Sequence, residues 1–337
     1  MTETAAGGVS VLHQFGFRAM NTDIDISFVC AEEDVRSLDM RARGWFQNVE
    51  TAFSRFWPGS ELCRLNRSAG RRALVSENML EVLLLAEKYR EETAGAFNPF
   101  LLTALRNAGY DVSFEYMGGT KPQSLEAPAR PLANAAHPIE FDAGMKAVRL
   151  SPGTEADLGG IAKSWAVKRL AHWMQHQRKL KQGMVNAGGD LTVWDHRKRS
   201  SQPWLVGVEH PWRPESDAGV LAMANGAAAT SSKLGRRWLT ERGPMHHLID
   251  PRTLLPSESD TVQCTVAGPD VTACEAWAKA LCILGSEEGL PRFREKAPAY
   301  EALLFTDRKQ TIFAGTGGSP VCEWRGIAFD RVYGTDS

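Results

Sequence analysis

The chain has 337 residues, of which 43% are hydrophobic and 23% charged, an ordinary composition for a globular protein that buries its own core. Its 39 basic and 40 acidic side chains nearly cancel, so we expect no bulk electrostatic affinity for nucleic acid. No apolar run reaches the length of about 18 residues that a spanning helix needs, so we expect no membrane insertion.

The N-terminal region has neither a basic start nor an apolar segment, so we expect residues 1–10 to be disordered and the protein to be cytoplasmic. Its six cysteines include no Cys-x-x-Cys pair. In a cytoplasmic protein, widely spaced cysteines are expected to be thiols rather than a disulfide framework.

Periodicity predicts mixed elements in the first half of the chain. Residues 22–28 alternate between apolar and polar side chains, which predicts a half-buried strand. Apolar residues three or four apart predict helices over 35–53 and, after a Ser76 cap, over 77–89. The glycines and prolines within 117–139 predict a long loop or insertion.

The second half is denser in predicted structure. A helix is expected at 162–173, another from Thr272 to near Gly285, and strands at 184–187, 191–194, 204–209, 262–267, 303–305 and 311–313, the last two as a hairpin. Strands are not followed by regular crossover helices, which favours an α+β fold over a doubly wound sheet.

One glycine-containing motif suits phosphate binding. Asp157-Leu-Gly-Gly-Ile-Ala-Lys163 places two glycines at a helix start, where free backbone N–H groups and the Lys163 ammonium would attract an anion. The alternative is a tight turn leading into a helix. Val185-Asn-Ala-Gly-Gly-Asp190 is similarly open to two readings, a ligand-contacting loop or a hairpin turn.

Two further motifs carry candidate side chains. In 246–253, His247 and Asp250 flank an apolar pair and are candidates for proton transfer or hydrogen bonding, or for a turn with a structural histidine. In 94–99, Phe97 on a loop of small residues suits contact with a flat ring, or simple packing.

Taken in order, these motifs resemble the ApbE family, the FAD:protein FMN transferases, from about Phe17 to Gly315. Two positions depart from the family pattern: Asn21 stands where the family usually has Gly, and Asn98 where it has Asp. The matching elements are Ala19–Thr22, Phe53–Phe56 with Ser60–Asn66, Thr93–Asn98, Asp157–Lys163, Asn186–Asp190, Ala229–Ser231 and His247–Thr253.

The resemblance implies a two-lobed α+β architecture related to the T-fold, formed by a single domain over 11–330 with the flavin between the lobes. It implies cleavage of FAD and transfer of FMN to a Thr or Ser of an acceptor protein, with Mg²⁺ on the pyrophosphate. It gives His247 a role in proton transfer, and Gly160 and Glu275 a role as metal ligands. The residues implied to line the FAD site are Met20, Phe56, Ala96, Phe97, Asn98, Asp157, Lys163 and Leu248.

The second metal element departs from the family pattern. The family has Asp-x-x-x-Thr on a helix, whereas this chain has Glu275 and Lys279. An ammonium cannot ligate Mg²⁺, and the longer Glu shifts the remaining carboxylate. Glu275 could instead belong to a capping box with Thr272, or form an i,i+4 pair with Lys279.

Three readings of this departure stay open. Lys279 replaces the metal and neutralises the pyrophosphate, the Mg²⁺ site is rearranged, or the flavin site is absent. The first predicts FAD binding that survives chelation and puts catalysis in doubt. The alternative functions are therefore an FAD pyrophosphatase, an FAD-binding protein or a flavin-free interaction protein.

Overall fold

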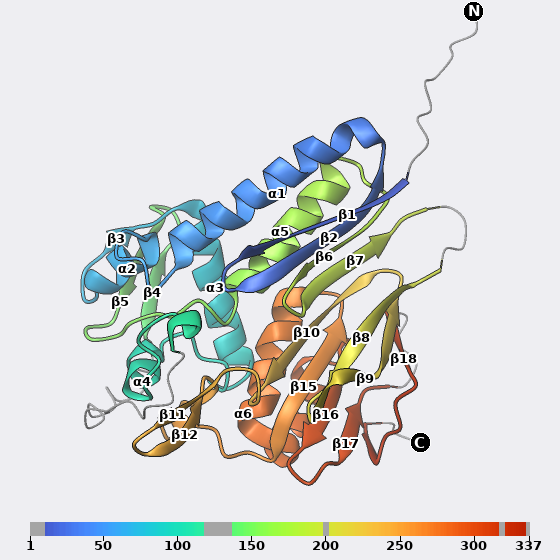
Figure 1. Ribbon diagram of the computed structural model, residues 1–337. Coiled ribbons are helices and arrows are strands. Elements are labelled where there is room, and N and C mark those ends of the chain that lie inside the picture. The colour runs from blue at the N-terminus through green and yellow to red at the C-terminus, as the bar shows by residue number, and fades with distance from the viewer. Residues whose placement is uncertain (1–10, 118–136, 198–201, 317–320, 335–337) are drawn as a thin grey trace, which may run out of the picture.

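A large, almost entirely antiparallel sheet runs through the computed structural model, which describes residues 11–117, 137–197, 202–316 and 321–334 (Figure 1). Only the last two strands pair in parallel. Within the described residues the nine strands follow the order β1 (Val11–Ala19), β2 (Thr22–Cys30), β6 (Gln182–Ala187), β7 (Asp190–Asp195), β10 (Gly226–Ser232), β15 (Thr261–Gly268), β16 (Glu301–Thr306), β17 (Thr311–Ala314) and β19 (Arg331–Tyr333).

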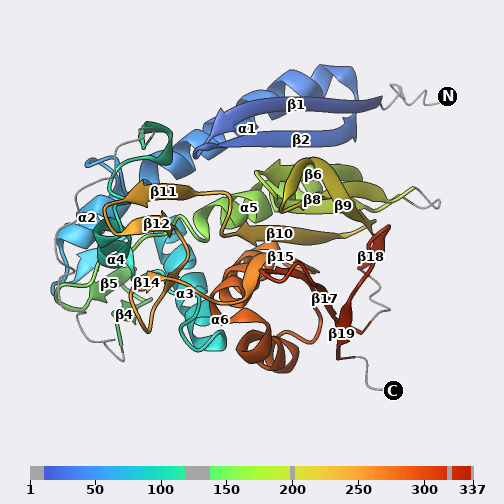
Figure 2. The ribbon, with the colours of Figure 1, turned by 60° about the horizontal axis from the view of Figure 1, so that its bottom comes forward.

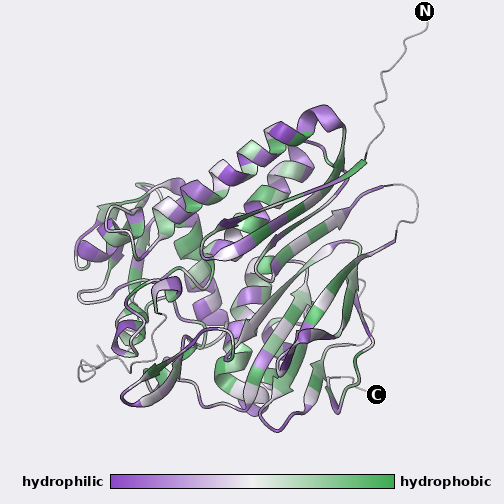
Figure 3. Cartoon of the chain, in the orientation of Figure 1, coloured by the Kyte–Doolittle hydropathy of each residue, from purple (hydrophilic) through white to green (hydrophobic). Residues whose placement is uncertain are grey.

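Helices cover one face of this sheet (Figures 1 and 2). The helices α1 (Glu32–Phe53), α5 (Ala162–His176) and α6 (Val271–Lys296) pack on it, and α3 (Glu77–Glu92) packs against α6. Along α1, hydrophilic and hydrophobic residues alternate at helical spacing in Figure 3, and the apolar stripe is buried. This amphipathic pattern explains why the helix lies on the sheet.

A three-stranded sheet covers part of the other face. Its strands are β8 (Trp204–His210), β9 (Arg213–Met223) and β18 (Cys322–Arg325). Leu221 and Met223 of β9 share a buried apolar cluster with Leu303 and Phe305 of β16. The large sheet is thus apolar on both faces over part of its width, which places it at the centre of a three-layer arrangement.

A second lobe stands beside one end of the sheet (Figure 1). Its own small core contains Tyr110, Trp238 and Met245. The lobe's elements are α2 (Glu61–Arg67), β3 (Ala73–Leu74), α4 (Leu102–Asn107), the 3-10 helix η1 (Phe114–Tyr116), β4 (Ile139–Asp142), β5 (Ala147–Leu150), β11 (Arg237–Thr240), β12 (Gly243–His246), β13 (Ile249–Asp250) and β14 (Leu255–Pro256).

The α+β prediction is confirmed, and each predicted helix and strand corresponds to an observed element. The helix predicted to end near Gly285 instead continues as α6 to Lys296, with an interruption at Gly285, which has φ 81° and ψ 179° between two helical stretches. No disulfide joins the six cysteines, as expected. Within the described ranges, no helix has the length and apolarity needed to cross a membrane.

Some sequence expectations differ from the structure or lie outside it. The predicted capping box is wrong, because α6 begins after Asp270, whose side chain accepts a hydrogen bond from the backbone N–H of Thr272 at 2.8 Å. Most of the insertion predicted at 117–139 lies outside the described residues, namely 118–136, and β4 already begins at Ile139. The segment 1–10, predicted to be disordered, also lies outside the described residues. The single domain over 11–330 stays a prediction.

The break in α6 predicts a strong preference for glycine. Replacing Gly285 by Ala would put its Cβ 2.6 Å from Asp260 Oδ1 and force a backbone conformation that is nearly exclusive to glycine. We expect Gly285→Ala to lower the free energy of unfolding by about 2–3 kcal/mol in denaturant titrations.

Gly44, inside α1, is the matched control because a Cβ there meets nothing within 4 Å. Gly44→Ala should raise the free energy of unfolding by about 0.5–1 kcal/mol. Equal effects of the two substitutions would contradict the described backbone of Gly285.

Candidate active site

A pocket of about 1020 Å³ opens between the end of the large sheet and the second lobe. It is lined by segments that are far apart in the sequence, including the β1–β2 turn, the start of α5, the β10–β11 loop and α6. Every residue assigned to the site from the sequence lines this pocket: Met20, Phe56, Ala96, Phe97, Asn98, Asp157, Gly160, Lys163, His247, Leu248, Glu275 and Lys279.

Two tight hairpin turns form one wall of the pocket. Met20 and Asn21 link β1 to β2 with φ 52° and 58°, and Gly188 and Gly189 link β6 to β7 with φ 60° and 96°. Positive φ at both central residues is typical of the two-residue turns that match strand twist. Asn21 tolerates this conformation well, which explains how it replaces glycine. The Val185–Asp190 motif is therefore a hairpin turn that also lines the pocket.

The Gly-Gly motif forms the turn into α5. Asp157 Oδ1 accepts a hydrogen bond from Gly159 N at 2.8 Å, and Asp157 Oδ2 lies 3.4 Å from Arg55 Nε. No side chain caps the N-terminus of α5, and Gly159, Gly160 and Lys163 face the pocket. This geometry leaves a positively polarised helix end directed at the pocket.

Ala96 and Phe97 form an apolar wall. The loop is held by side-chain hydrogen bonds, since Phe97 N donates to Thr93 Oγ1 at 3.0 Å and Phe100 N donates to Asn98 Oδ1 at 2.9 Å. Phe97 lines the pocket but is only 4% exposed, so its ring is packed in the wall rather than projecting into solvent.

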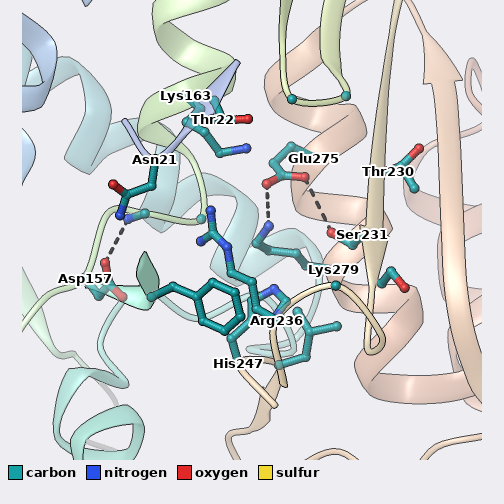
Figure 4. A pocket seen from close by; sticks show the side chains of 18 of the residues that line it. Asn21, Thr22, Asp157, Lys163, Thr230, Ser231, Arg236, His247, Glu275 and Lys279 are labelled. Atoms are coloured by element: carbon teal, nitrogen blue, oxygen red, sulfur yellow. Dashed lines mark hydrogen bonds and ion pairs between the residues drawn. The ribbon is translucent and has the colours of Figure 1, made fainter. Parts of the chain in front are cut away.

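Two half-buried lysines and two buried carboxylates form ion pairs at the pocket, and Figure 4 shows Lys163, Glu275 and Lys279. Lys163 Nζ lies 3.2 Å from Asp190 Oδ2, and Lys279 forms an ion pair with Glu275. Ser231 Oγ donates to the other oxygen of Glu275 at 3.5 Å. Burial, together with the charge of Glu275, raises the pKa of Asp190 to about 6 despite the nearby lysines. The predicted i,i+4 pair of Glu275 and Lys279 is thus confirmed.

Lys279 lies directly against the Gly-Gly turn. A Cβ placed on Gly160 would be 3.2 Å from Lys279 Cε and 3.3 Å from Phe97 Cε2. The lysine stem therefore packs where the resemblance placed a metal ion between Gly160 and Glu275.

His247 is a buried, neutral imidazole on the pocket wall. Burial lowers its pKa well below 6.5, and the charges of Lys279 and Arg236 act in the same direction. Its Nδ1 atom has no hydrogen-bond partner within the described residues. A neutral imidazole at neutral pH can accept a proton.

Asp250, considered together with His247 from the sequence, serves a different purpose. It is absent from the pocket lining and forms an ion pair with Arg252 at 2.8 Å, which in turn pairs with Glu288 at 2.7 Å. The short spacing of His247 and Asp250 did not bring both side chains to the pocket.

Sequence reasoning missed two arginines that line the pocket, Arg55 and Arg236. The side chain of Arg55 is 5% exposed, lies over the rings of Phe56 and Tyr110, and leaves Nη2 without a partner among the described residues. Arg236 follows β10 and extends into the same space in Figure 4. Arg55 lies within the matching element Phe53–Phe56 but was not singled out there, and Arg236 lies outside the matching elements, so no spacing signal pointed to it.

Known proteins share both sequence and fold with this chain. FAD:protein FMN transferases from Treponema pallidum and Klebsiella pneumoniae are 28% and 25% identical to it, over 80% and 76% of this chain and 77% and 78% of theirs. The crystal structure of the ApbE protein from Thermotoga maritima superposes with a TM-score of 0.76 at 22% identity, covering 89% of this chain and 96% of the other.

The flavin transferase ApbE from Vibrio cholerae superposes with a TM-score of 0.74 at 19% identity, covering 95% of this chain and 98% of the other. These likenesses support the fold, with its sheet and second lobe. The profile of the ApbE family matches residues 20–304, most of the chain. The protein therefore belongs to the ApbE family.

Proposed function

We propose that this chain is an FAD:protein FMN transferase, which binds FAD in the pocket and transfers its FMN half to a Thr or Ser of an acceptor protein. The observation that carries the proposal is the convergence of all the predicted site residues on one pocket between the lobes. The curated relatives described above are named for this activity.

The pocket offers what FAD requires. The flavin and adenine rings of FAD need apolar walls, which Met20, Phe56, Phe97 and Leu248 supply. Ala96 and Asn98, on either side of Phe97, line the same part of the pocket. The diphosphate of FAD needs N–H donors and positive charge, which the uncapped start of α5 and Lys163 supply next to Asp157.

In the proposed reaction, the acceptor hydroxyl oxygen attacks the phosphorus of the FMN half. A P–O bond forms to the acceptor, the P–O bond to the bridging oxygen breaks, and AMP leaves with the bridging oxygen. The hydroxyl proton passes to His247, whose neutral imidazole lies on the pocket wall. Most of the catalytic effect then comes from charge stabilisation and positioning of the diphosphate.

The family resemblance implies Mg²⁺, with the Gly160 carbonyl and Glu275 as ligands. The residues present do not fit this ion, because the Glu275 carboxylate is already engaged by Lys279 and Ser231, and the Lys279 stem lies against Gly160. Mg²⁺ requires near-octahedral oxygen coordination and would be repelled by an ammonium. We derive no catalytic step through a metal.

The same Lys279 position favours a second candidate function, an FAD-binding protein or an FAD pyrophosphatase. A point charge can hold a diphosphate, but it bridges the oxygens of an in-line displacement less well than a divalent ion. The acceptor protein and the cytoplasmic location expected from the sequence stay predictions.

Release of AMP tests the proposed activity. Purified protein incubated with FAD should produce AMP, and an acceptor carrying a reactive Thr or Ser should become fluorescent under ultraviolet light after denaturing electrophoresis. Chromatography of the small molecules provides the first measurement. AMP with free FMN indicates a pyrophosphatase, and intact FAD that remains bound indicates a binding protein.

Replacing His247 by Asn tests its role as a base. We expect kcat to fall by about 10²–10⁴-fold with little change in the Kd for FAD, because FAD binding does not use the proton transfer. Since the pKa of His247 is lowered, the acidic limb of the wild-type pH profile of kcat/KM should lie below pH 6.5 and be lost in the variant.

His176→Asn is the matched control, since His176 is exposed on α5 and absent from the pocket lining. It should leave kcat and the pH profile unchanged. A His247→Asn variant with wild-type kcat would remove this histidine from the mechanism.

A further inference from the structure

We propose that Lys279, together with Arg236, takes the place of a divalent cation in this chain and holds the diphosphate of FAD, so that FAD binds without metal. This inference rests on the proposed function only in taking FAD as the ligand of the pocket. It concerns how this chain's own side chains supply the positive charge.

Lys279 lies beside the glycine turn at the start of α5. Its Cε atom lies 3.2 Å from a Cβ placed on Gly160, at the start of α5, where the glycine turn and free helix N-terminus face the pocket. A diphosphate drawn to that helix end would therefore meet the ammonium of Lys279 as well as that of Lys163. A side chain at position 160 would press on the lysine stem and on Phe97, so the glycine lets the stem pack closely here.

The two carboxylates near Lys279 are already paired with lysines. Glu275 pairs with Lys279, and Asp190 pairs with Lys163 at 3.2 Å; the two carboxylates are 3% and 1% exposed. Ser231 Oγ also donates to Glu275, at 3.5 Å, so both oxygens of that carboxylate have partners. The carboxylates thus anchor ammonium groups and do not form a ligand set for a cation.

The side chains around the pocket carry an excess of positive charge. The chain as a whole has a net charge of −1, whereas cationic side chains outnumber anionic ones around the pocket. The cations are Arg18, Arg55, Lys163, Arg236, Arg237 and Lys279, and the anions are Glu50, Asp157, Glu209 and Glu275. With Asp190, which pairs with Lys163 behind the lining, the cations still outnumber the anions by six to five, and this positive excess favours a diphosphate.

Arg236 adds a second cation next to Lys279. It lines the pocket, lies close enough to His247 to lower the pKa of that imidazole, and forms no ion pair with any residue in the described part of the chain. Figure 4 shows its side chain reaching into the same space as Lys279 and His247. A guanidinium with a planar set of donors and no acidic partner is suited to a phosphate group.

Calorimetric titration with FAD, once in excess EDTA and once in Mg²⁺, tests the inference. We expect saturable binding in EDTA, with a Kd within about threefold of that in Mg²⁺. Binding that appears only with Mg²⁺ would overturn the inference while leaving the proposed function intact. Failure to bind under both conditions would overturn the inference and the proposed function together.

Substitutions of Arg236 and Lys279 test which side chains supply the positive charge that binds FAD. In EDTA, Arg236→Met should weaken FAD binding by about tenfold, and Lys279→Met/Glu275→Gln by about tenfold or more. The double variant removes both members of the buried pair, so that no unpaired carboxylate is left to unfold the protein. Wild-type affinity in both variants would overturn the inference.

Lys296→Met is the matched control, because Lys296 is an exposed lysine at the other end of α6, paired with Glu295 and absent from the pocket lining. It should bind FAD as the wild type does. The variant Glu275→Asp/Lys279→Thr restores the family's usual residue pair, and its FAD binding should become dependent on Mg²⁺. If this variant instead binds FAD equally well in EDTA, Lys279 is not the substitute for the ion.

Discussion

The ion pair between Lys279 and Glu275 is the constraint on which the rest of the site depends. Both side chains come from α6 and are largely buried, 16% and 3% exposed. Removing two charges from water costs several kcal/mol per ion unless each finds a close partner, so neither residue can be considered alone. The pair occupies the space beside Gly160 and determines whether that space accepts a cation or an anion.

The backbone around this pair is arranged to leave it accessible from the pocket. The hairpin turns at Met20–Asn21 and Gly188–Gly189 bring the ends of four strands to the same wall, and the Gly-Gly turn opens α5 toward them. The second lobe closes the opposite side with Arg55, Phe56 and Tyr110. The site is therefore shared between lobes, and a rigid sheet holds most of its polar groups.

Much of the fold was predictable because local periodicity agreed with tertiary burial. The strand at 22–28 and the helices at 35–53 and 77–89 each bury the face that their sequence pattern indicates. β1 was not predicted, although Phe15, Phe17 and Ala19 alternate with polar residues and glycine; it is an edge strand with only exposed or half-buried residues. The capping box failed because the N-cap is Asp270, two residues before Thr272.

The sequence by itself determined the order of the motifs and the α+β class, which follow from residue type and spacing. The side chains that meet in the pocket were implied by the resemblance of those motifs to the ApbE family. Only the tertiary structure decided that Lys163 pairs with Asp190, that Asp250 pairs with Arg252 away from the pocket, and that Arg55 and Arg236 join the site. Which segments meet at the pocket depends on the packing of the sheet, the helices and the second lobe, and no local pattern encodes that packing.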